Sequence, residues 1–251
     1  MTAMMSNPLC QPFEFWGDHT HGVLFIHGFT ASPGTLYPLG KDISARTGFY
    51  VRSILLPGHG TTPEEMRRYN AEDWLRCAQA AFDQMRRECR VVSVIGLSMG
   101  GTLALRLAET RPVKKIVCIA AALSVYNRKS IFANWLWPFV PFIENKPGKE
   151  AENFLAEYNE TYSRTPVRSV GELNKLMKIT RRSLAGIHCP IMVVRAGKDE
   201  TVRPESADWI MKGVSSSEPF SAKPTCLHLR PRTGTAWRES CKFFKSLAAC
   251  L

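Results

Sequence analysis

A short glycine-rich segment, residues 94–101, has the residue spacing with the clearest chemical meaning in this chain. It contains a Gly-x-Ser-x-Gly pentapeptide with Ser98 at its centre. A serine on a sharp strand-to-helix turn exposes its hydroxyl to a cleft, and the flanking glycines allow the tight backbone. A β-branched run precedes the motif, and an apolar helical pattern follows it through Ala108. The segment predicts a nucleophilic serine; a glycine-rich turn that only connects two elements is the alternative.

A serine nucleophile needs two further groups. Its hydroxyl reacts weakly at neutral pH, so a histidine must accept the proton and a carboxylate must orient that histidine. In chains with this turn the order is serine, acid, histidine. Asp199 follows the apolar run 191–194, at a strand end where such sheets present functional loops, and His228 is the one histidine of six that comes later. We predict Ser98, Asp199 and His228 as catalytic residues; the alternative for Asp199 is a turn residue that hydrogen-bonds its own backbone.

The loop after the first apolar run, residues 22–26, supplies the next expectation. This loop reads His-Gly-Phe, and in a nucleophile-elbow enzyme it contributes a backbone N–H to the oxyanion hole, beside the N–H of the residue after the serine. We therefore predict Phe29 and Met99 as the two donors. His27 and His59 are interpreted as residues that shape loops near the cleft, not as proton carriers.

The elements that must position these residues alternate along the chain. Apolar runs at 49–55, 91–95, 115–120 and 191–194 predict strands, and helical patterns follow most of them. Such alternation predicts an α/β fold with a mainly parallel sheet and helices on both faces. Asn70 is expected to cap a helix, and Ser32 is expected to cap another with Pro33 at its first position.

The alternation stops between residues 124 and 186, within what we expect to be a single domain spanning 1–251. We predict that this segment is an inserted cap over the active site. Aromatic and aliphatic residues concentrate between 131 and 143. They could pack the cap onto the core, line an acyl pocket, or form an exposed lip that contacts lipid aggregates.

Composition sets the remaining bounds. The N-terminus has no basic region followed by an apolar one, and no run is long enough to span a bilayer, so we expect a cytoplasmic protein. The eight cysteines are scattered without metal-ligand spacing, which predicts reduced thiols and no zinc or other metal. The net charge of +11 is interpreted as solvated surface charge, because no nucleic-acid motif accompanies it.

Several motifs in consistent order resemble one family. The sequences FIHGFTASP at 25–33, LPGHGT at 56–61, GLSMGG at 96–101 and GKD at 197–199 look like bacterial carboxylesterases and monoacylglycerol lipases of the α/β-hydrolase fold. The resemblance covers roughly residues 12–215. It implies an esterase for short- to medium-chain acyl esters, with a small-molecule ester as partner, a small cap, no cofactor and an acyl-serine intermediate. Ser98 matches the family nucleophile, Asp199 the acid, and Phe29 with Met99 the oxyanion donors.

The C-terminal segment departs from that family pattern. Such enzymes usually present the histidine in a Ser-Gly-His turn before an acidic segment, whereas residues 225–232 are basic and lack the glycine. A shifted reading frame is one hypothesis for this composition, although an apolar stripe from Trp237 to Leu251 still predicts a final helix. A thioesterase or a lysophospholipase would use the same three residues. If His228 is misplaced, the alternative is a hydrolase-fold binding protein without turnover.

Overall fold

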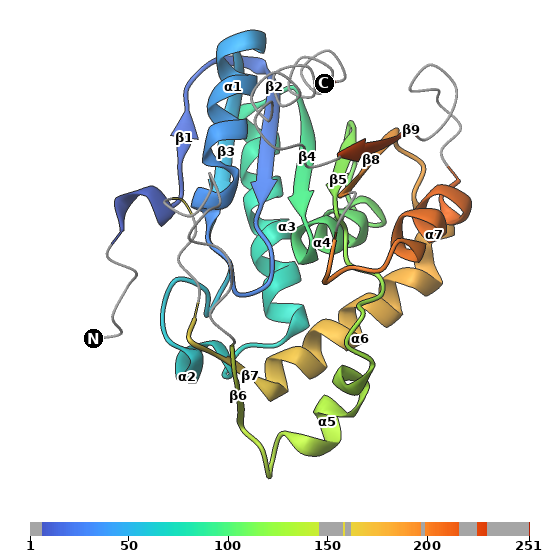
Figure 1. Ribbon diagram of the computed structural model, residues 1–251. Helices are drawn as coiled ribbons and strands as arrows, with labels where there is room; N and C mark the ends of the chain where they lie inside the picture. The colour runs from blue at the N-terminus through green and yellow to red at the C-terminus, as the bar shows by residue number, and fades with distance from the viewer. Residues whose placement is uncertain (1–6, 146–157, 159–161, 197–198, 216–224, 230–250) are drawn as a thin grey trace.

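A seven-stranded sheet forms the centre of the molecule in the computed structural model (Figure 1). The structure describes residues 7–145, 158, 162–196, 199–215, 225–229 and 251. The strand order is β1-β3-β2-β4-β5-β8-β9, and all neighbouring pairs are parallel except β1 with β3. The prediction of a mainly parallel sheet is confirmed. The strands are β1 (Glu14–Phe15), β2 (Asp18–Ile26), β3 (Phe49–Ile54), β4 (Val91–Leu97), β5 (Ile116–Ile119), β8 (Ile191–Ala196) and β9 (Thr225–Leu229).

Helices cover both faces of this sheet. Successive side chains of a strand point to opposite faces. In β2, Val23 and Phe25 accordingly join the apolar cluster under α1, whereas Leu24 and Ile26 join the larger cluster under the other helices. All four side chains are fully buried, as expected for a strand in the middle of a parallel sheet. The helices are α1 (Tyr37–Thr47) on the first face, and α3 (Ala71–Glu88), α4 (Met99–Ala108), α6 (Val167–Ser183) and α7 (Glu205–Gly213) around the second cluster.

The two predicted helix caps had different outcomes. Asn70 does cap α3, because its side chain accepts hydrogen bonds from the N–H groups of Glu72 and Asp73. Ser32 does stand at an N-cap position with Pro33 directly after it, but its side chain makes no cap hydrogen bond, and the element it begins is a 3₁₀ turn, η2 (Pro33–Leu36), which precedes α1. The reason is Pro38, which has no N–H and interrupts α-type hydrogen bonding at the point where the predicted helix would continue.

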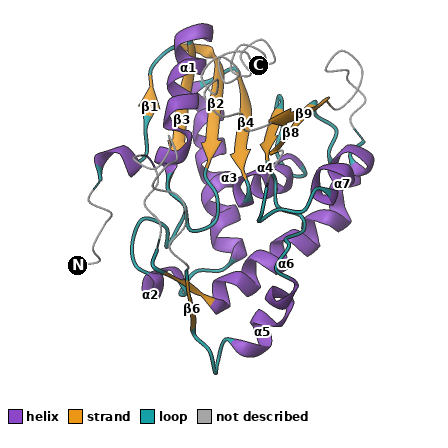
Figure 2. Ribbon diagram, in the orientation of Figure 1, coloured by secondary structure: helices purple, strands orange, loops and turns teal. Residues whose placement is uncertain are grey.

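The segment between β5 and β8 lies beyond the carboxyl ends of β2 and β4, at the bottom of Figures 1 and 2. Three of its apolar side chains, Ile131, Trp135 and Phe139, are 68%, 72% and 78% exposed. They therefore form an exposed lip and do not pack this segment onto the core. Besides α6 the segment contains η3 (Arg128–Phe132), α5 (Ala133–Leu136), β6 (Phe142–Glu144), β7 (Arg164–Pro166) and η6 (Leu184–Gly186). The remaining short elements are η1 (Pro8–Cys10) and α2 (Pro63–Met66).

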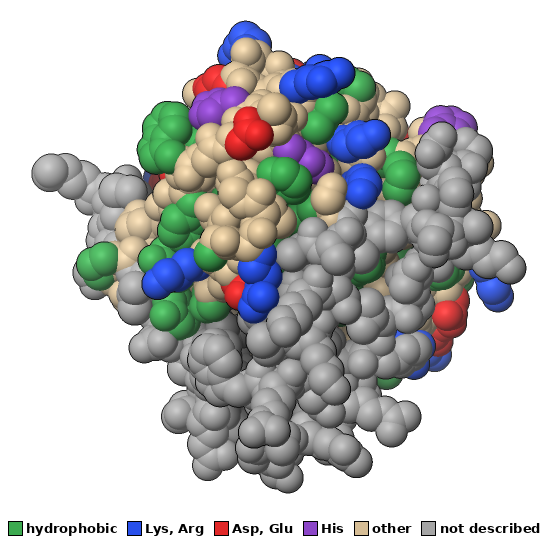
Figure 3. All heavy atoms as spheres, turned by 90° about the horizontal axis from the view of Figure 1, so that it is seen from above, with side chains coloured by type: hydrophobic (Ala, Val, Ile, Leu, Met, Phe, Trp, Pro, Cys, Tyr) green, Lys and Arg blue, Asp and Glu red, His purple; other side chains and the backbone are tan. Residues whose placement is uncertain are grey.

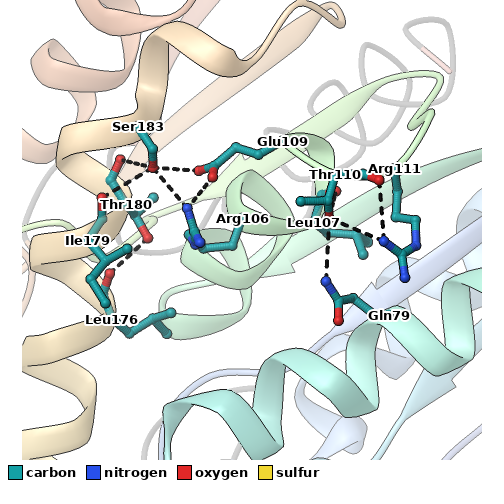
Figure 4. Close-up of polar contacts among 10 residues, drawn as sticks. All are labelled: Gln79, Arg106, Leu107, Glu109, Thr110, Arg111, Leu176, Ile179, Thr180 and Ser183. Atoms are coloured by element: carbon teal, nitrogen blue, oxygen red, sulfur yellow. Dashed lines mark hydrogen bonds and ion pairs between the residues drawn. The ribbon is translucent and has the colours of Figure 1, made fainter.

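A polar cluster joins α6 to α4, the helix that follows the predicted nucleophile (Figure 4). Ser183 donates a hydrogen bond to Glu109 Oε1 at 2.7 Å and accepts one from Arg106 at 3.0 Å. Arg106 and Glu109 also form an ion pair, and their side chains are only 20% and 11% exposed. Breaking a pair at this degree of burial leaves an unpaired charge, so the cluster fixes α6 against α4.

The surface at the amino ends of the strands shows no single charged patch on its described part (Figure 3). Lys and Arg side chains there are dispersed among apolar, acidic and histidine side chains. Cys10, Cys77, Cys89, Cys118 and Cys189 are free thiols, and the side chains of the other three cysteines lie outside the described part of the structure. No helix in the described ranges is long and apolar enough to cross a membrane. The predicted final helix lies outside the described residues, apart from Leu251.

Candidate active site

Ser98 lies on the turn between β4 and α4, as the motif predicted. Its backbone has φ 53° and ψ −115°, which an L-residue adopts only under strain. Two hydrogen bonds hold the turn: the Ser98 N–H donates to the Ile119 carbonyl at 2.8 Å, and the Ser98 carbonyl accepts from the Ala122 N–H at 3.2 Å. Ile119 is the last residue of β5 and Ala122 lies three residues beyond it, so the neighbouring strand and the loop after it fix the position of the serine.

The glycines of the motif are required by contact as well as by conformation. A Cβ on Gly96 would lie 2.2 Å from the Gly100 carbonyl oxygen, and a Cβ on Gly100 would lie 2.0 Å from the Ile26 carbonyl oxygen. Real Cβ atoms essentially never come closer than 3.0 Å to such atoms. The start of α4 therefore packs directly on the backbone of β2, which no larger residue would allow.

The predicted oxyanion donors, Phe29 and Met99, belong to the two elements that meet at this contact between the start of α4 and the end of β2. Met99 is the first residue of α4, where a backbone N–H has no partner inside the helix. Phe29 is in the loop after β2. Its neighbour Gly28 is so close to the serine that a Cβ added to Gly28 would lie 3.4 Å from Ser98 Cβ. Within the described part of the chain, neither the Phe29 nor the Met99 N–H has a hydrogen-bond acceptor. Both donors remain available to a ligand at Ser98.

His27 holds the loop that carries Phe29. Its Nδ1–H donates to the Gly28 carbonyl at 2.8 Å, and its Nε2 accepts from the Leu56 N–H at 3.1 Å. These bonds use both ring nitrogens of a neutral imidazole, and complete burial lowers the pKa of His27 to about 4. The ring is therefore not a proton carrier at neutral pH, in agreement with its interpretation as a loop-shaping residue.

His59 packs against His27, with ring centroids 4.9 Å apart. Its Nδ1 is 3.3 Å from the Pro57 carbonyl, to which it donates, whereas its buried Nε2 has no partner among the described residues. Burial, with a smaller contribution from His27, lowers the pKa of His59 well below its usual value. Both imidazoles are neutral and belong to the wall of the site.

Asp199 follows β8 and holds a tight turn. Its Oδ1 accepts hydrogen bonds from the N–H groups of Thr201 at 2.9 Å and Val202 at 2.8 Å. This is the turn geometry named above as the alternative to catalysis, and it leaves Oδ2 for another partner. Asp199 lines a small cavity together with Ala120 and Ala121, the two residues that directly follow β5. The acid and the serine thus flank the same strand end.

The backbone of His228 lies on β9, paired with Arg195 of β8. It is one residue from the carboxyl end of this strand, at the edge of the sheet from which Asp199 also emerges. The side chain of His228 is outside the described part of the structure. The structure therefore brings Ser98, Phe29 and Met99 together, and it places His228 by its backbone alone.

Two contributions to the site were not predicted. Ala120, directly after β5, has φ 46° and lines the small cavity beside Asp199. Tyr162 donates to the Gly58 carbonyl at 2.6 Å and accepts from the Thr61 N–H at 3.1 Å, which ties the inserted segment to the loop of His59. An alanine and an isolated tyrosine carry no sequence signal for such contacts. Among the described residues, no group of His, Cys, Asp or Glu side chains could hold a metal ion.

Comparisons with known proteins agree on the family. Residues 17–229 match the hydrolase family described as serine aminopeptidase, S33. The chain is 36% identical to a thermostable monoacylglycerol lipase of Bacillus sp. (strain H-257) over 200 residues, 78% of either chain. It is 28% identical to a carboxylesterase of Bacillus subtilis (strain 168) over 209 residues, 83% of either chain.

Solved structures give the same fold. A structure of the metagenome-derived lipolytic enzymes LipS and LipT matches with a TM-score of 0.80 and 27% identity, covering 95% of this chain and 98% of that one. The monoacylglycerol lipase of Paleococcus ferrophilus matches with a TM-score of 0.74 over 96% of this chain and 98% of that one. Because its identity is only 15%, this second likeness concerns the fold alone.

Proposed function

Because the chain belongs to the hydrolase family described as serine aminopeptidase, S33, we propose that it is a serine esterase whose nucleophile is Ser98. The substrates proposed are short- to medium-chain carboxylic esters, including monoacylglycerols. The observation that carries the proposal is the strained Ser98 turn, together with the Phe29 and Met99 N–H groups, which have no acceptor among the described residues. The names of the two Bacillus relatives support the choice of an ester as substrate.

The proposed mechanism assigns one role to each residue. Ser98 Oγ attacks the acyl carbon while His228 accepts its proton and Asp199 orients the imidazole. The Phe29 and Met99 N–H groups stabilise the oxyanion, a contribution of about 2.7 to 4 kcal/mol per donor. His228 then returns the proton to the leaving alcohol, and water releases the acid from the acyl-serine.

The inserted segment, residues 124–186, is proposed as a cap that admits the acyl chain. The exposure of Ile131, Trp135 and Phe139 supports transient contact of this lip with lipid aggregates. We test it by replacing Trp135 and Phe139 with serine. Hydrolysis of emulsified monoacylglycerol should fall while hydrolysis of a soluble short-chain ester is retained; equal loss on both substrates contradicts a lipid contact.

A cytoplasmic location is also proposed, supported by the five described cysteines, which are free thiols.

Covalent labelling by a fluorophosphonate tests the nucleophile and its base. The wild-type chain should be labelled at Ser98, Ser98→Ala should not be labelled, and His228→Ala should react at least about 10²-fold more slowly. The exposed His188 provides the matched control, since His188→Ala removes a histidine elsewhere. A folded wild-type protein that does not react would favour the binding protein without turnover.

The alcohol and acyl preferences need a separate measurement. A panel of p-nitrophenyl esters from two to sixteen carbons, beside monoacylglycerols, acyl thioesters and lysophospholipids, compares kcat/KM across the candidate classes. We expect the highest values for short- to medium-chain oxygen esters. A higher value for thioesters or lysophospholipids would assign the chain to those classes instead.

A further inference from the structure

A groove of about 500 Å³ lies between α6, η3 and the loop that follows Asp199. This volume is in the range of small-molecule sites. Neither Ser98 nor Asp199 lines it, and the function proposed above does not use it. The lining residues that matter here are the cations Arg128, Lys175, Lys178, Arg181 and Arg203.

The charge of the groove is entirely positive. Its lining contains those five cations and no aspartate or glutamate. Lys175, Lys178 and Arg181 follow one another at three-residue steps on α6, so they lie on one side of the helix and repel one another. A cluster of this kind is unfavourable in the free protein unless an anion complements it.

Three of the five cations have no carboxylate partner among the described residues. Lys175 lies 4.0 Å from Glu72, and Arg203 lies 3.0 Å from Glu205. Arg181 forms no ion pair with any described residue, and its guanidinium lies over the Trp209 ring. Arg128 and Lys178 also form no ion pair with any described residue. They enter the groove from different elements, one from η3 and the other from α6. An anion between them would be held from two sides.

The walls of the groove are fixed by polar contacts. Asn174 of α6 donates a hydrogen bond from its side chain to the Ser130 carbonyl of η3 at 2.6 Å. On the opposite side, the Arg203 N–H donates to the Ser124 carbonyl at 2.9 Å. The Nε of Arg203 is buried and has no partner in the described structure. A buried donor without an acceptor costs free energy that a ligand oxygen could recover.

We propose that this groove binds a phosphate-bearing anion. A phosphate group carries nearly two negative charges and three acceptor oxygens, which matches several cations better than a single carboxylate does. The apolar side chains of Leu123, Ile131 and Met177 also line the groove and leave room for a carbon moiety attached to the phosphate. The phosphate could belong to a free phosphorylated compound or to a lipid headgroup, since both offer the same oxygens.

The first test uses inorganic pyrophosphate and isothermal titration calorimetry at physiological salt. The double variant Arg128→Ala/Lys178→Ala removes two of the three cations without a carboxylate partner, one from each side of the groove. Its matched control is Lys129→Ala/Arg182→Ala, which removes the same charge from the same two elements outside the groove lining. We expect the wild type and the control to bind equally and the groove variant to bind at least about tenfold more weakly.

Stability and activity keep this test independent of the proposed esterase. Because the removed side chains are exposed and repelled by their neighbours, the groove variant should unfold at the wild-type temperature or above it. Pyrophosphate should raise the unfolding temperature of the wild type and not that of the variant. An absence of binding to the wild type, or an equal loss in both double variants, overturns the proposal whether or not Ser98 is active.

A second arm identifies the source of the phosphate. Vesicles of phosphatidylglycerol are compared with vesicles of phosphatidylcholine, which lack net charge. If the groove recognises a lipid headgroup, the control variant should bind to phosphatidylglycerol vesicles and the groove variant should not. Vesicle binding that is equal in both variants, together with loss of pyrophosphate binding in the groove variant alone, assigns the site to a free phosphorylated compound.

Discussion

The candidate site has two halves that are held in different ways: a nucleophile half around Ser98, and a peripheral half that contains Asp199 and His228. Ser98 is fixed by backbone contacts with β2 and β5, and the described non-glycine residues with positive φ, Thr30, Ser98 and Ala120, each follow a central strand. Asp199 instead holds its own turn, and His228 lies on β9, which pairs with β8 at the end of the described sheet. Backbone strain is therefore stored where the core over-determines the backbone, and the residues proposed for proton transfer are at the periphery.

The largest effect on activity is expected from a substitution of Asp199. Asp199→Asn keeps an oxygen that can accept from the Thr201 and Val202 N–H groups, so the turn should survive. If Asp199 orients the catalytic base, kcat should fall by about 10⁴-fold, because an amide supports the wrong histidine tautomer. Steady-state kinetics and the unfolding temperature are measured together.

Asp199→Ala is the control for the turn, since it removes both the charge and the acceptor. It should lose activity and also unfold at a lower temperature than Asp199→Asn. Near-normal turnover in Asp199→Asn would mean that the carboxylate has only the structural role.

The nucleophile half should be the less tolerant half toward added volume. Gly100→Ala would place its Cβ 2.0 Å from the Ile26 carbonyl oxygen, and backbone atoms on both sides cannot move apart cheaply. We expect a loss of more than about 4 kcal/mol in the free energy of unfolding, measured in urea. At Gly186 the nearest atom to an added Cβ is Glu109 Cγ at 3.9 Å, so Gly186→Ala should change stability by no more than about 0.5 kcal/mol. Similar effects at the two positions would contradict the close contact between α4 and β2.

The same division explains what could be predicted from the sequence. The central strands β2, β3, β4, β5 and β8, the serine turn and the cap of α3 follow from local patterns, because apolar runs, glycines and Asn70 act on their own neighbours in sequence. The strands β1 and β9 at the two ends of the sheet were not predicted. The start of α1 was misplaced because Pro38 restricts hydrogen bonds several residues away. The roles of Ala120 and Tyr162 depend on contacts across more than 20 residues of sequence, for which a single chain carries no pattern.

Lowering the pH should decrease the free energy of unfolding through the buried histidines beside Ser98, at pH values above those at which carboxylates are protonated. His27 and His59 have lowered pKa values in the folded state, the former about 4, so between about pH 6.5 and 4 the unfolded chain binds protons that the folded chain does not. Stability must therefore fall as the pH is lowered through this range, by up to about 1.4 kcal/mol per pH unit for each histidine. Urea unfolding between pH 5 and 7.5 measures the slope.

His59→Asn isolates one of these contributions. An asparagine amide can replace the Nδ1–H that donates to Pro57, and it does not titrate. The slope should decrease by about 1 kcal/mol per pH unit in this variant. An unchanged slope would mean that His59 is not the neutral, buried group described above.

The smallest expected effect tests the strain itself, by comparing two replacements of Ser98. Both Ser98→Ala and Ser98→Gly remove the hydroxyl and should abolish turnover. Alanine keeps a Cβ in the backbone conformation with φ 53°, whereas glycine adopts positive φ without a steric cost. The relief of strain exceeds the extra conformational entropy that glycine loses on folding, so Ser98→Gly should be more stable than Ser98→Ala by about 1 kcal/mol. If the glycine variant is instead the less stable one, the turn is not strained, and the contrast between a strained central half and a relaxed peripheral half fails at its most specific residue.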